Sequence, residues 1–155
     1  MVRGVKSQSP TVLLVLALLA GTEVHARDYL KSEFAQQRGF SVGVVTEGGK
    51  IVWVAGQAAL RDEEGRSLVD DPQGQARAIF RAMERTLKRA GGNLQNLTTI
   101  TVFLTDPRHL QVLGPIRREF FPDGNFPAST TITVSNLPEP GMVIEIQGTA
   151  VIGDR

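Results

Sequence analysis

One ionisable side chain, Glu145, lies in an otherwise uncharged C-terminal segment that runs from Met142 to Ile152. The β-branched residues of this segment favour a strand, and strand alternation places Glu145 on the same face as Val143 and Gln147. An ionisable group therefore projects toward whatever that face of the strand meets. The alternative is an exposed or ion-paired strand residue.

The rest of the sequence lacks the motifs of most familiar enzyme classes. It contains no cysteine, nucleophile elbow, phosphate-binding loop or dinucleotide fingerprint. Its histidines are His25 and His109, so the serines have no plausible partner for a nucleophilic triad except the distant His109. A transition-metal site would need unusual all-oxygen ligands, and we therefore expect no metal.

The N-terminus has the three parts of an export signal. Arg3 and Lys6 precede an apolar run over residues 12–20, and Val24-His25-Ala26 forms a small-x-small cleavage pattern. We therefore expect a signal peptide at 1–26 and an exported protein, periplasmic or secreted. The alternative is an uncleaved amphipathic anchor, because the run is too short to span a bilayer.

Cleavage after Ala26 would leave residues 27–155, a common size for one domain. Loss of Arg3, Lys6 and Glu23 lowers the formal net charge from +1 to zero. Nucleic acids and anionic membranes normally bind basic surfaces, so we expect neither as a partner of the mature chain.

The hydrophobic pattern predicts an α+β domain after a polar N-terminal arm at 27–38. Residues 41–45 and 51–55 flank Gly48-Gly49 as a predicted hairpin, and a shorter irregular hairpin is expected around 61–66. Further strands are predicted at 97–105, 130–134 and 142–152.

Two helices are predicted between these strands, each beginning with Asp-Pro. The first starts at Asp71-Pro72 and stops at Gly91-Gly92. The second starts at Asp106-Pro107, and a kink or restart is expected at Gly114-Pro115. Its residues at helical spacing are Leu110, Leu113, Ile116, Arg117 and Phe120.

Strands and helices alternate only in the middle of the chain, which indicates a mixed sheet with both helices packed on one face. The other face then has no cover within the chain. An apolar uncovered face is buried most simply by association of identical copies, so a homo-oligomer is expected.

Several segments resemble, in order and spacing, the reactive intermediate deaminase family, also called YjgF-like or RidA-like. Phe126-Pro127-Ala128-Ser129 resembles the family's F-P-A-R, and the segment 137–151 resembles its L-P…E-[IV]-E signature. The remaining matches are Gly39-Phe40-Ser41, Val52-Trp53-Val54-Ala55-Gly56-Gln57, Gln75-Ala76-Arg77 and Thr101-Val102-Phe103-Leu104-Thr105-Asp106. The resemblance covers a domain at 39–153.

This resemblance implies a chorismate-mutase-like α+β fold, a homotrimer and three ligand clefts between subunits. It also implies cofactor-free hydrolysis of imines and enamines, with Glu145 at the position of the family's catalytic glutamate. The residues that it places at the substrate-binding cleft are Phe40, Gly56, Gln57, Ser129, Thr130 and Gln147. A non-catalytic trimer that binds a small metabolite is the alternative. RNA cleavage, also attached to this family, is disfavoured by the neutral charge and the export signal.

The chain departs from the family pattern where the substrate carboxylate would bind. Ser129 stands in place of the family's arginine, Phe40 in place of a frequent tyrosine, and Gln147 in place of a second glutamate. A serine hydroxyl cannot replace a bidentate guanidinium. The sequence therefore predicts a less charged pocket for a neutral or differently charged small molecule. Trp53 either lines this pocket or belongs to the core.

Overall fold

A computed structural model describes residues 27–154, so the predicted export signal at 1–26 lies outside the described part of the chain. Within residues 27–154, no helix combines the length and apolar character needed to cross a membrane. The helices and strands, in chain order, are β1 Asp28–Leu30, α1 Glu33–Gln37, β2 Gly43–Val45, β3 Lys50–Gln57, α2 Pro72–Arg89, η1 Leu94–Asn96, β4 Leu97–Leu104, η2 Pro107–His109, α3 Leu110–Phe120, β5 Ala128–Thr133 and β6 Ile144–Ile152.

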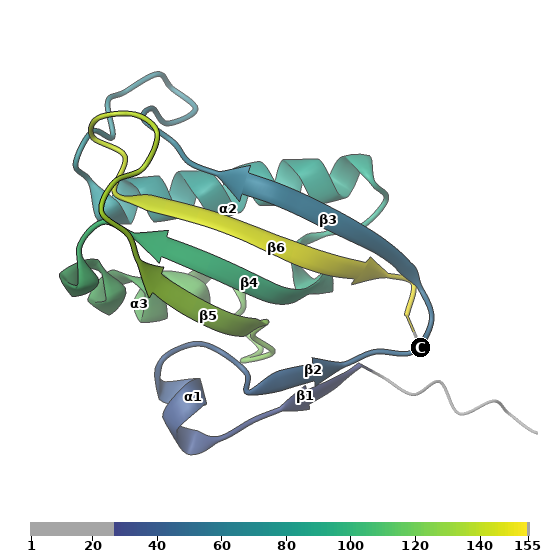
Figure 1. The fold of residues 1–155 in the computed structure, drawn as a ribbon. Coiled ribbons are helices and arrows are strands. Elements are labelled where there is room, and N and C mark those ends of the chain that lie inside the picture. The colour runs from purple at the N-terminus through teal and green to yellow at the C-terminus, as the bar shows by residue number, and fades with distance from the viewer. Residues whose placement is uncertain (1–26, 155) are drawn as a thin grey trace, which may run out of the picture.

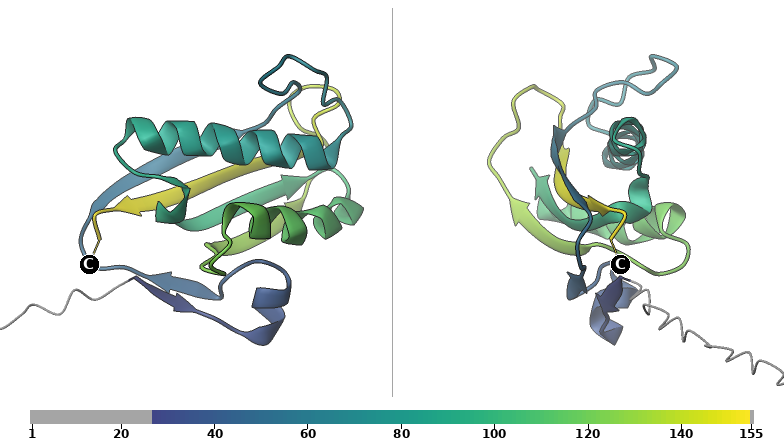
Figure 2. Two further views of the ribbon diagram at one scale, coloured as in Figure 1. Left: turned by 180° about the vertical axis from the view of Figure 1, so that it is seen from behind. Right: turned by 90° about the vertical axis from the view of Figure 1, so that its right-hand side faces the viewer.

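The main sheet has four strands in the order β3-β6-β4-β5 (Figure 1). β6 is antiparallel to both β3 and β4, whereas β4 and β5 are parallel, so the sheet is mixed. α2 and α3 both lie on one face of this sheet (Figure 2). The predicted α+β class, the mixed sheet and the placement of both helices are confirmed.

α2 begins and ends where its capping residues predict. The Asp71 side chain accepts a hydrogen bond from the Gly74 backbone N–H at 3.0 Å, and Pro72 occupies the first helical position. Gly91, just beyond the helix, has a φ of +88°, which favours glycine. The predicted helix is therefore confirmed at both ends.

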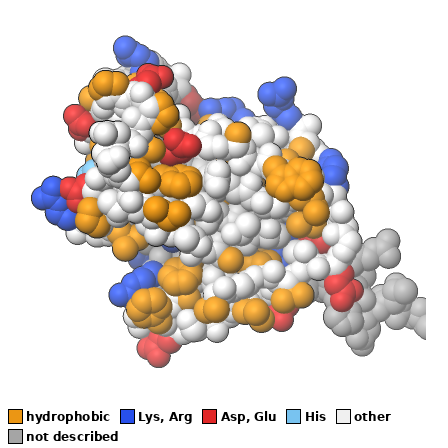
Figure 3. All heavy atoms as spheres, in the orientation of Figure 1, with side chains coloured by type: hydrophobic (Ala, Val, Ile, Leu, Met, Phe, Trp, Pro, Cys, Tyr) orange, Lys and Arg blue, Asp and Glu red, His pale blue; other side chains and the backbone are white. Residues whose placement is uncertain are grey.

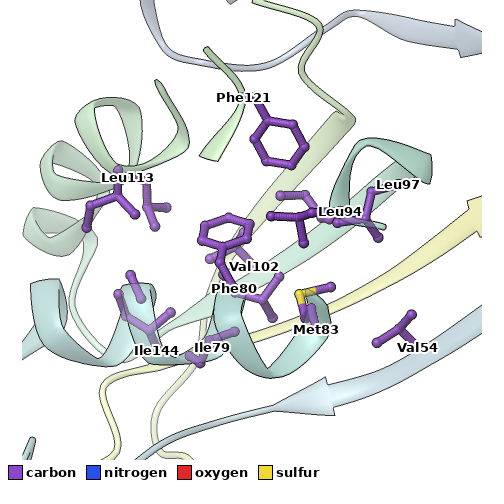
Figure 4. Close-up of a cluster of buried hydrophobic side chains, with 14 of the residues drawn as sticks. Val54, Ile79, Phe80, Met83, Leu94, Leu97, Val102, Leu113, Phe121 and Ile144 are labelled. Carbon is purple, nitrogen blue, oxygen red and sulfur yellow. The ribbon is translucent and has the colours of Figure 1, made fainter. Parts of the chain in front are cut away.

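The core lies between the sheet and the helices, where apolar side chains of α2 meet those of β4 and β6 (Figure 4). α2 contributes Ile79, Phe80 and Met83, none of which has exposed surface. Each such buried side chain stabilises the fold by about 1.5–3 kcal/mol. This packing holds the sheet as a rigid support for the groups on its edges and its uncovered face.

The predicted hairpin across Gly48-Gly49 is wrong, because β2 and β3 do not pair. β2 pairs with β1, while β3 pairs with β6 from Lys50 opposite Ile152 to Val54 opposite Gly148. The glycines do form a turn with positive φ, but it leads the chain from a two-stranded sheet to the four-stranded one. β6 is a longer partner than β2 and offers β3 a longer hydrogen-bonded ladder.

The polar N-terminal arm predicted at 27–38 contains regular structure. It forms β1 and the short helix α1, whose first turn is capped by Ser32. Pairing of β1 with β2 supplies hydrogen bonds that no periodic pattern within 27–38 could indicate. β1, α1 and β2 together pack below the main sheet in Figure 1.

α3 continues from Leu110 through Pro115 to Phe120, so the helix does not restart at Gly114-Pro115. The kink that the sequence also allowed there stays a prediction. The change in helix type falls earlier, where the 3-10 turn η2 meets α3 at Leu110. Proline costs a helix interior about 3 kcal/mol. Burial of Leu113 and Ile116 against the core offsets this cost.

The predicted uncovered face is present and carries exposed apolar side chains. Ile51 and Trp53 on β3 and Ile132 on β5 are among the large exposed hydrophobic residues of the chain. Figure 3 shows this face toward the viewer, with hydrophobic groups separated by polar surface. Trp53 is 79% exposed, so its interpretation as a core residue is wrong for the single chain.

Candidate functional site

A groove of about 790 Å³ lies between α1 and α3, beside the edge strand β5. Phe34, Phe40 and Leu110 give it apolar walls, and Ser129 lies in it together with Arg117 of α3. Two of the residues predicted for the binding cleft, Phe40 and Ser129, are therefore brought together here.

The Arg117 guanidinium occupies the place where the sequence suggested a missing cation. Its Nη2 donates a hydrogen bond to Ser129 Oγ at 2.8 Å, and the whole residue is only 2% exposed. Its Nε is buried and has no hydrogen-bond partner among the described residues. α3 thus supplies, next to Ser129, a positive charge that β5 lacks. The less charged ligand pocket stays a prediction.

Burial lowers the pKa of Arg117 to about 10, because the low-dielectric interior disfavours the cation. The group still carries its charge at neutral pH. No acidic side chain among residues 27–154 forms an ion pair with it. A buried cation without an anionic partner is unfavourable for the fold and favourable for binding an anion.

The local sequence holds Arg117 in place through a close approach of Gly39. Gly39 has a φ of +72°, and a Cβ there would lie 3.1 Å from Arg117 Cβ and 3.3 Å from the Gly114 carbonyl oxygen. The positive φ favours glycine at this position, and a side chain there would also be in tight contact with α3. The next residues continue the contact, since the Ser41 N–H donates to the Pro127 carbonyl at 3.1 Å beside β5.

The outer wall of the groove is aromatic. The rings of Phe34 and Phe40 meet edge to face with centroids 6.3 Å apart, and the Arg38 guanidinium lies 3.8 Å from the Phe34 ring centroid. Such contacts combine apolar surface with a defined geometry. α1, which the sequence did not predict, therefore forms one side of the candidate site.

Glu145 lies on the uncovered face of the sheet, where Gly56 makes room for it. A Cβ on residue 56 would lie 2.0 Å from Glu145 Oε1, so the carboxylate occupies the space that the glycine leaves. Alternation along β6 places Gln147 on the same face, and Thr130 lies on that face of β5. The predicted glutamate, glycine, glutamine and threonine thus share one surface.

Gln57 does not join this group of polar residues. Its side-chain amide donates to the carbonyls of Ala55 and Gly56, each at 3.2 Å, and so folds back on its own strand. Its predicted contact with a ligand stays a prediction.

Ser129 and Glu145 point to opposite faces of the sheet in one chain. Ser129 pairs with Ile100, which is buried on the helix side, whereas Glu145 lies between the fully buried Ile144 and Ile146 and so faces the other way. A ligand that touches both groups therefore needs a second copy of the chain.

Arg117 is the functional candidate that sequence reasoning missed. In the sequence, Arg117 lies at helical spacing with apolar residues that form the buried side of the helix. A charged residue on a buried side needs a polar partner, so this position indicated that Arg117 has a special role. Identifying the partner required knowing that α3 packs beside β5.

Comparison with known proteins places the chain in a broad group of similar folds. A profile of the family described as endoribonuclease L-PSP matches residues 30–152. A Rid-family protein of unknown function from Yersinia pestis is 22% identical with a TM-score of 0.71, covering 81% of this chain and 98% of its own. A protein of unknown function from Pseudomonas aeruginosa is 30% identical with a TM-score of 0.61, covering 74% and 82%. A YjgF-family protein from Mycobacterium tuberculosis is 26% identical with a TM-score of 0.58, covering 82% and 100%. The matched residues include both the groove and the uncovered face.

Proposed function

Because the chain belongs to the endoribonuclease L-PSP family, which is the YjgF/RidA family, we propose that it is a cofactor-free hydrolase of imines or enamines. Membership supports a deaminase-like or small-molecule-binding role. The observation that carries the finer proposal is the carboxylate of Glu145 above Gly56, on a face that only another copy of the chain can complete. A non-catalytic trimer that binds a small metabolite is the alternative.

The proposed reaction needs one base and one bound water. Water adds to the carbon of the C=N bond while Glu145 orients it and accepts one of its protons. The protonated glutamate returns that proton to nitrogen, which gives a carbinolamine. The glutamate then takes the proton of the new hydroxyl group and passes it to nitrogen, so that the C=O bond forms, the C–N bond breaks and ammonia leaves. Water supplies the carbonyl oxygen and both hydrogens gained by ammonia, so no redox partner is required.

Glu145→Gln should lower kcat/KM by about 100-fold or more, because the amide cannot accept the proton. The measurement is ammonia release from a panel of imines with and without a carboxylate. Glu47→Gln is a matched control, since Glu47 is exposed in the turn before β3 and should keep full activity. Absence of Glu145-dependent turnover on every imine would leave the non-catalytic binder as the function.

The working form in this proposal is a homotrimer with its uncovered sheet faces turned inward. Trp53 and Ile51 then become buried, which removes exposed apolar surface from water. Light scattering should give three times the mass of one chain, and Trp53→Glu should lower that mass. Arg89→Glu, on the exposed side of α2, should not. A monomer in the wild type would refute this assembly.

We also propose that the protein acts outside the cytoplasm after removal of residues 1–26. The proposal rests on the signal pattern and on the folded part, in which Arg27, the first residue of the proposed mature chain, binds Asp154. The protein recovered from outside the cytoplasm should begin at Arg27 by N-terminal sequencing. Retention of the full chain inside the cells would refute export.

A further inference from the structure

We infer that the groove between α1 and α3 binds the carboxylate of an organic acid with an apolar body, with Arg117 as the anion-binding residue and Ser129 as its helper. This inference rests on the proposed function, because it names the class of substrate that the proposed hydrolase would take. The sequence predicted a neutral or differently charged small molecule, and this inference specifies an anionic one.

The first argument is that Arg117 lacks a counter-ion. The acidic residues on the elements next to it are already engaged: Glu119 pairs with Arg77, Asp106 with Arg108, and Glu33 accepts from Gln37. A guanidinium has five N–H donors, and among the described residues Arg117 uses one of them, toward Ser129. The groove therefore contains a buried cation whose remaining donors have no partner within the described chain.

The second argument is the geometry of the Arg117–Ser129 pair. The Ser129 hydroxyl accepts from Nη2, so its own hydrogen is available to donate to another oxygen. A guanidinium edge beside a hydroxyl donor suits the two oxygens of a carboxylate. Ser129 then holds the arginine side chain in one orientation as well as contacting the ligand.

The third argument concerns the rest of the ligand. The walls next to Arg117 come from Phe34, Phe40 and Leu110, which offer rings and an aliphatic chain. Apolar walls with one convergent polar group are typical of sites for small organic molecules. The groove therefore favours a carboxylic acid with a hydrophobic substituent over a sugar or a highly polar anion.

Isothermal titration with phenylacetate and with its neutral analogue phenylacetamide tests the inference. Phenylacetate should bind saturably and at least tenfold more tightly than the amide, because only the acid pairs with the cation. Acetate should bind more weakly than phenylacetate, since it lacks the apolar body. Equal affinity for the acid and the amide would overturn the inference.

Arg117→Met should weaken phenylacetate binding at least tenfold, while Arg89→Met, the same change at an exposed arginine of α2, should leave it within twofold. Without ligand, Arg117→Met should unfold at the same temperature as the wild type or higher, because an uncompensated buried charge has been removed. Retained binding in Arg117→Met, or a marked fall in its unfolding temperature, would indicate a structural role and overturn the inference. Arg117→Lys, which keeps the charge, should bind more tightly than Arg117→Met.

Glu145→Gln separates this inference from the proposed reaction. The variant should lose turnover but still bind phenylacetate as the wild type does. Acid binding without turnover on any imine would refute the hydrolase and leave the acid site standing. Glu145-dependent turnover with no preference for carboxylated imines, together with no phenylacetate binding, would refute the acid site and leave the hydrolase standing.

Discussion

Among single residues, the hydrogen-bonded pair of Arg117 and Ser129 has the clearest consequence for function. Ser129 stands where the family has an arginine on the strand. The guanidinium of Arg117, on α3, donates a hydrogen bond to this serine at 2.8 Å. A single substitution that restores the strand arginine would therefore add a second cation rather than replace a missing one. The two positions have to be changed together if the charge is to be moved from helix to strand.

Ser129→Arg should destabilise the wild-type protein by about 1–4 kcal/mol more than Ser129→Met, because it places two cations together in a nearly buried position. In an Arg117→Met background, this extra cost should disappear. Urea unfolding of the four variants forms a double-mutant cycle, with the methionine at 129 as the control for volume. A coupling energy near zero would show that the two positions do not share one charge site.

Among contacts between elements, the side chain of Gln75 links α2 to the segments before α2 and before β6. Its side chain is fully buried and donates to the carbonyls of Leu68 and Gly141 at 2.7 and 2.6 Å. Its Oε1 accepts from the N–H groups of Val143 and Ile144 at 2.9 and 3.3 Å. This one amide therefore fixes the start of β6 relative to α2, and β6 carries Glu145.

Gln75→Leu should lower the free energy of unfolding by at least about 3 kcal/mol, because it leaves several buried backbone groups without partners. Gln73→Leu, the same change at an exposed position two residues earlier in α2, should alter stability by no more than about 0.5 kcal/mol. Chemical denaturation followed by far-UV circular dichroism measures both. Similar stabilities for the two variants would contradict the role of Gln75.

In the whole molecule, the two ends of the described chain are joined by an ion pair between Arg27 and Asp154. Arg27 binds both carboxylate oxygens of Asp154, at 2.8 and 2.7 Å, and also donates to the carbonyl oxygens of Gln95 and Val151. Both charged side chains are almost buried, with 9% and 7% exposed. This contact ties the segment before β1 to the end of β6 and so holds the small sheet against the large one.

Asp154→Asn should lower the free energy of unfolding by about 1–3 kcal/mol at pH 7. The hydrogen bond from Arg27 lowers the pKa of Asp154 below 3.8, so the stabilisation is complete above that pH and is lost as pH falls through the lowered value. The difference between wild type and variant should therefore shrink at pH 2–3. Asp123→Asn, at an exposed turn position, is the control. An equal difference at both pH values would contradict the ion pair.

The arrangement of the whole chain also separates Arg117 from Glu145. The groove with Arg117 and the face with Glu145 lie on opposite sides of one sheet, so one chain alone does not bring the two groups together. The sequence had placed Ser129 and Glu145 in clefts between subunits through a family resemblance that the comparisons confirm. The α+β chorismate-mutase-like fold follows from the same relationship.

The sequence by itself determined those helices and strands that depend on residues close together in the chain. Asp71-Pro72 and Gly91 delimited α2, and β-branched alternation identified β4 and the face on which Glu145 lies. Capping and periodicity depend on residues only a few positions apart, so they can be read before any tertiary contact is known.

Only the tertiary structure decided which distant segments meet. β3 pairs with β6 instead of its neighbour β2, and β2 pairs with β1. Arg117 became a candidate for anion binding because α3 packs beside Ser129 and no carboxylate of the described chain forms an ion pair with the guanidinium. Strand pairing and buried charge depend on competition among partners far apart in the sequence, and no local pattern records its outcome.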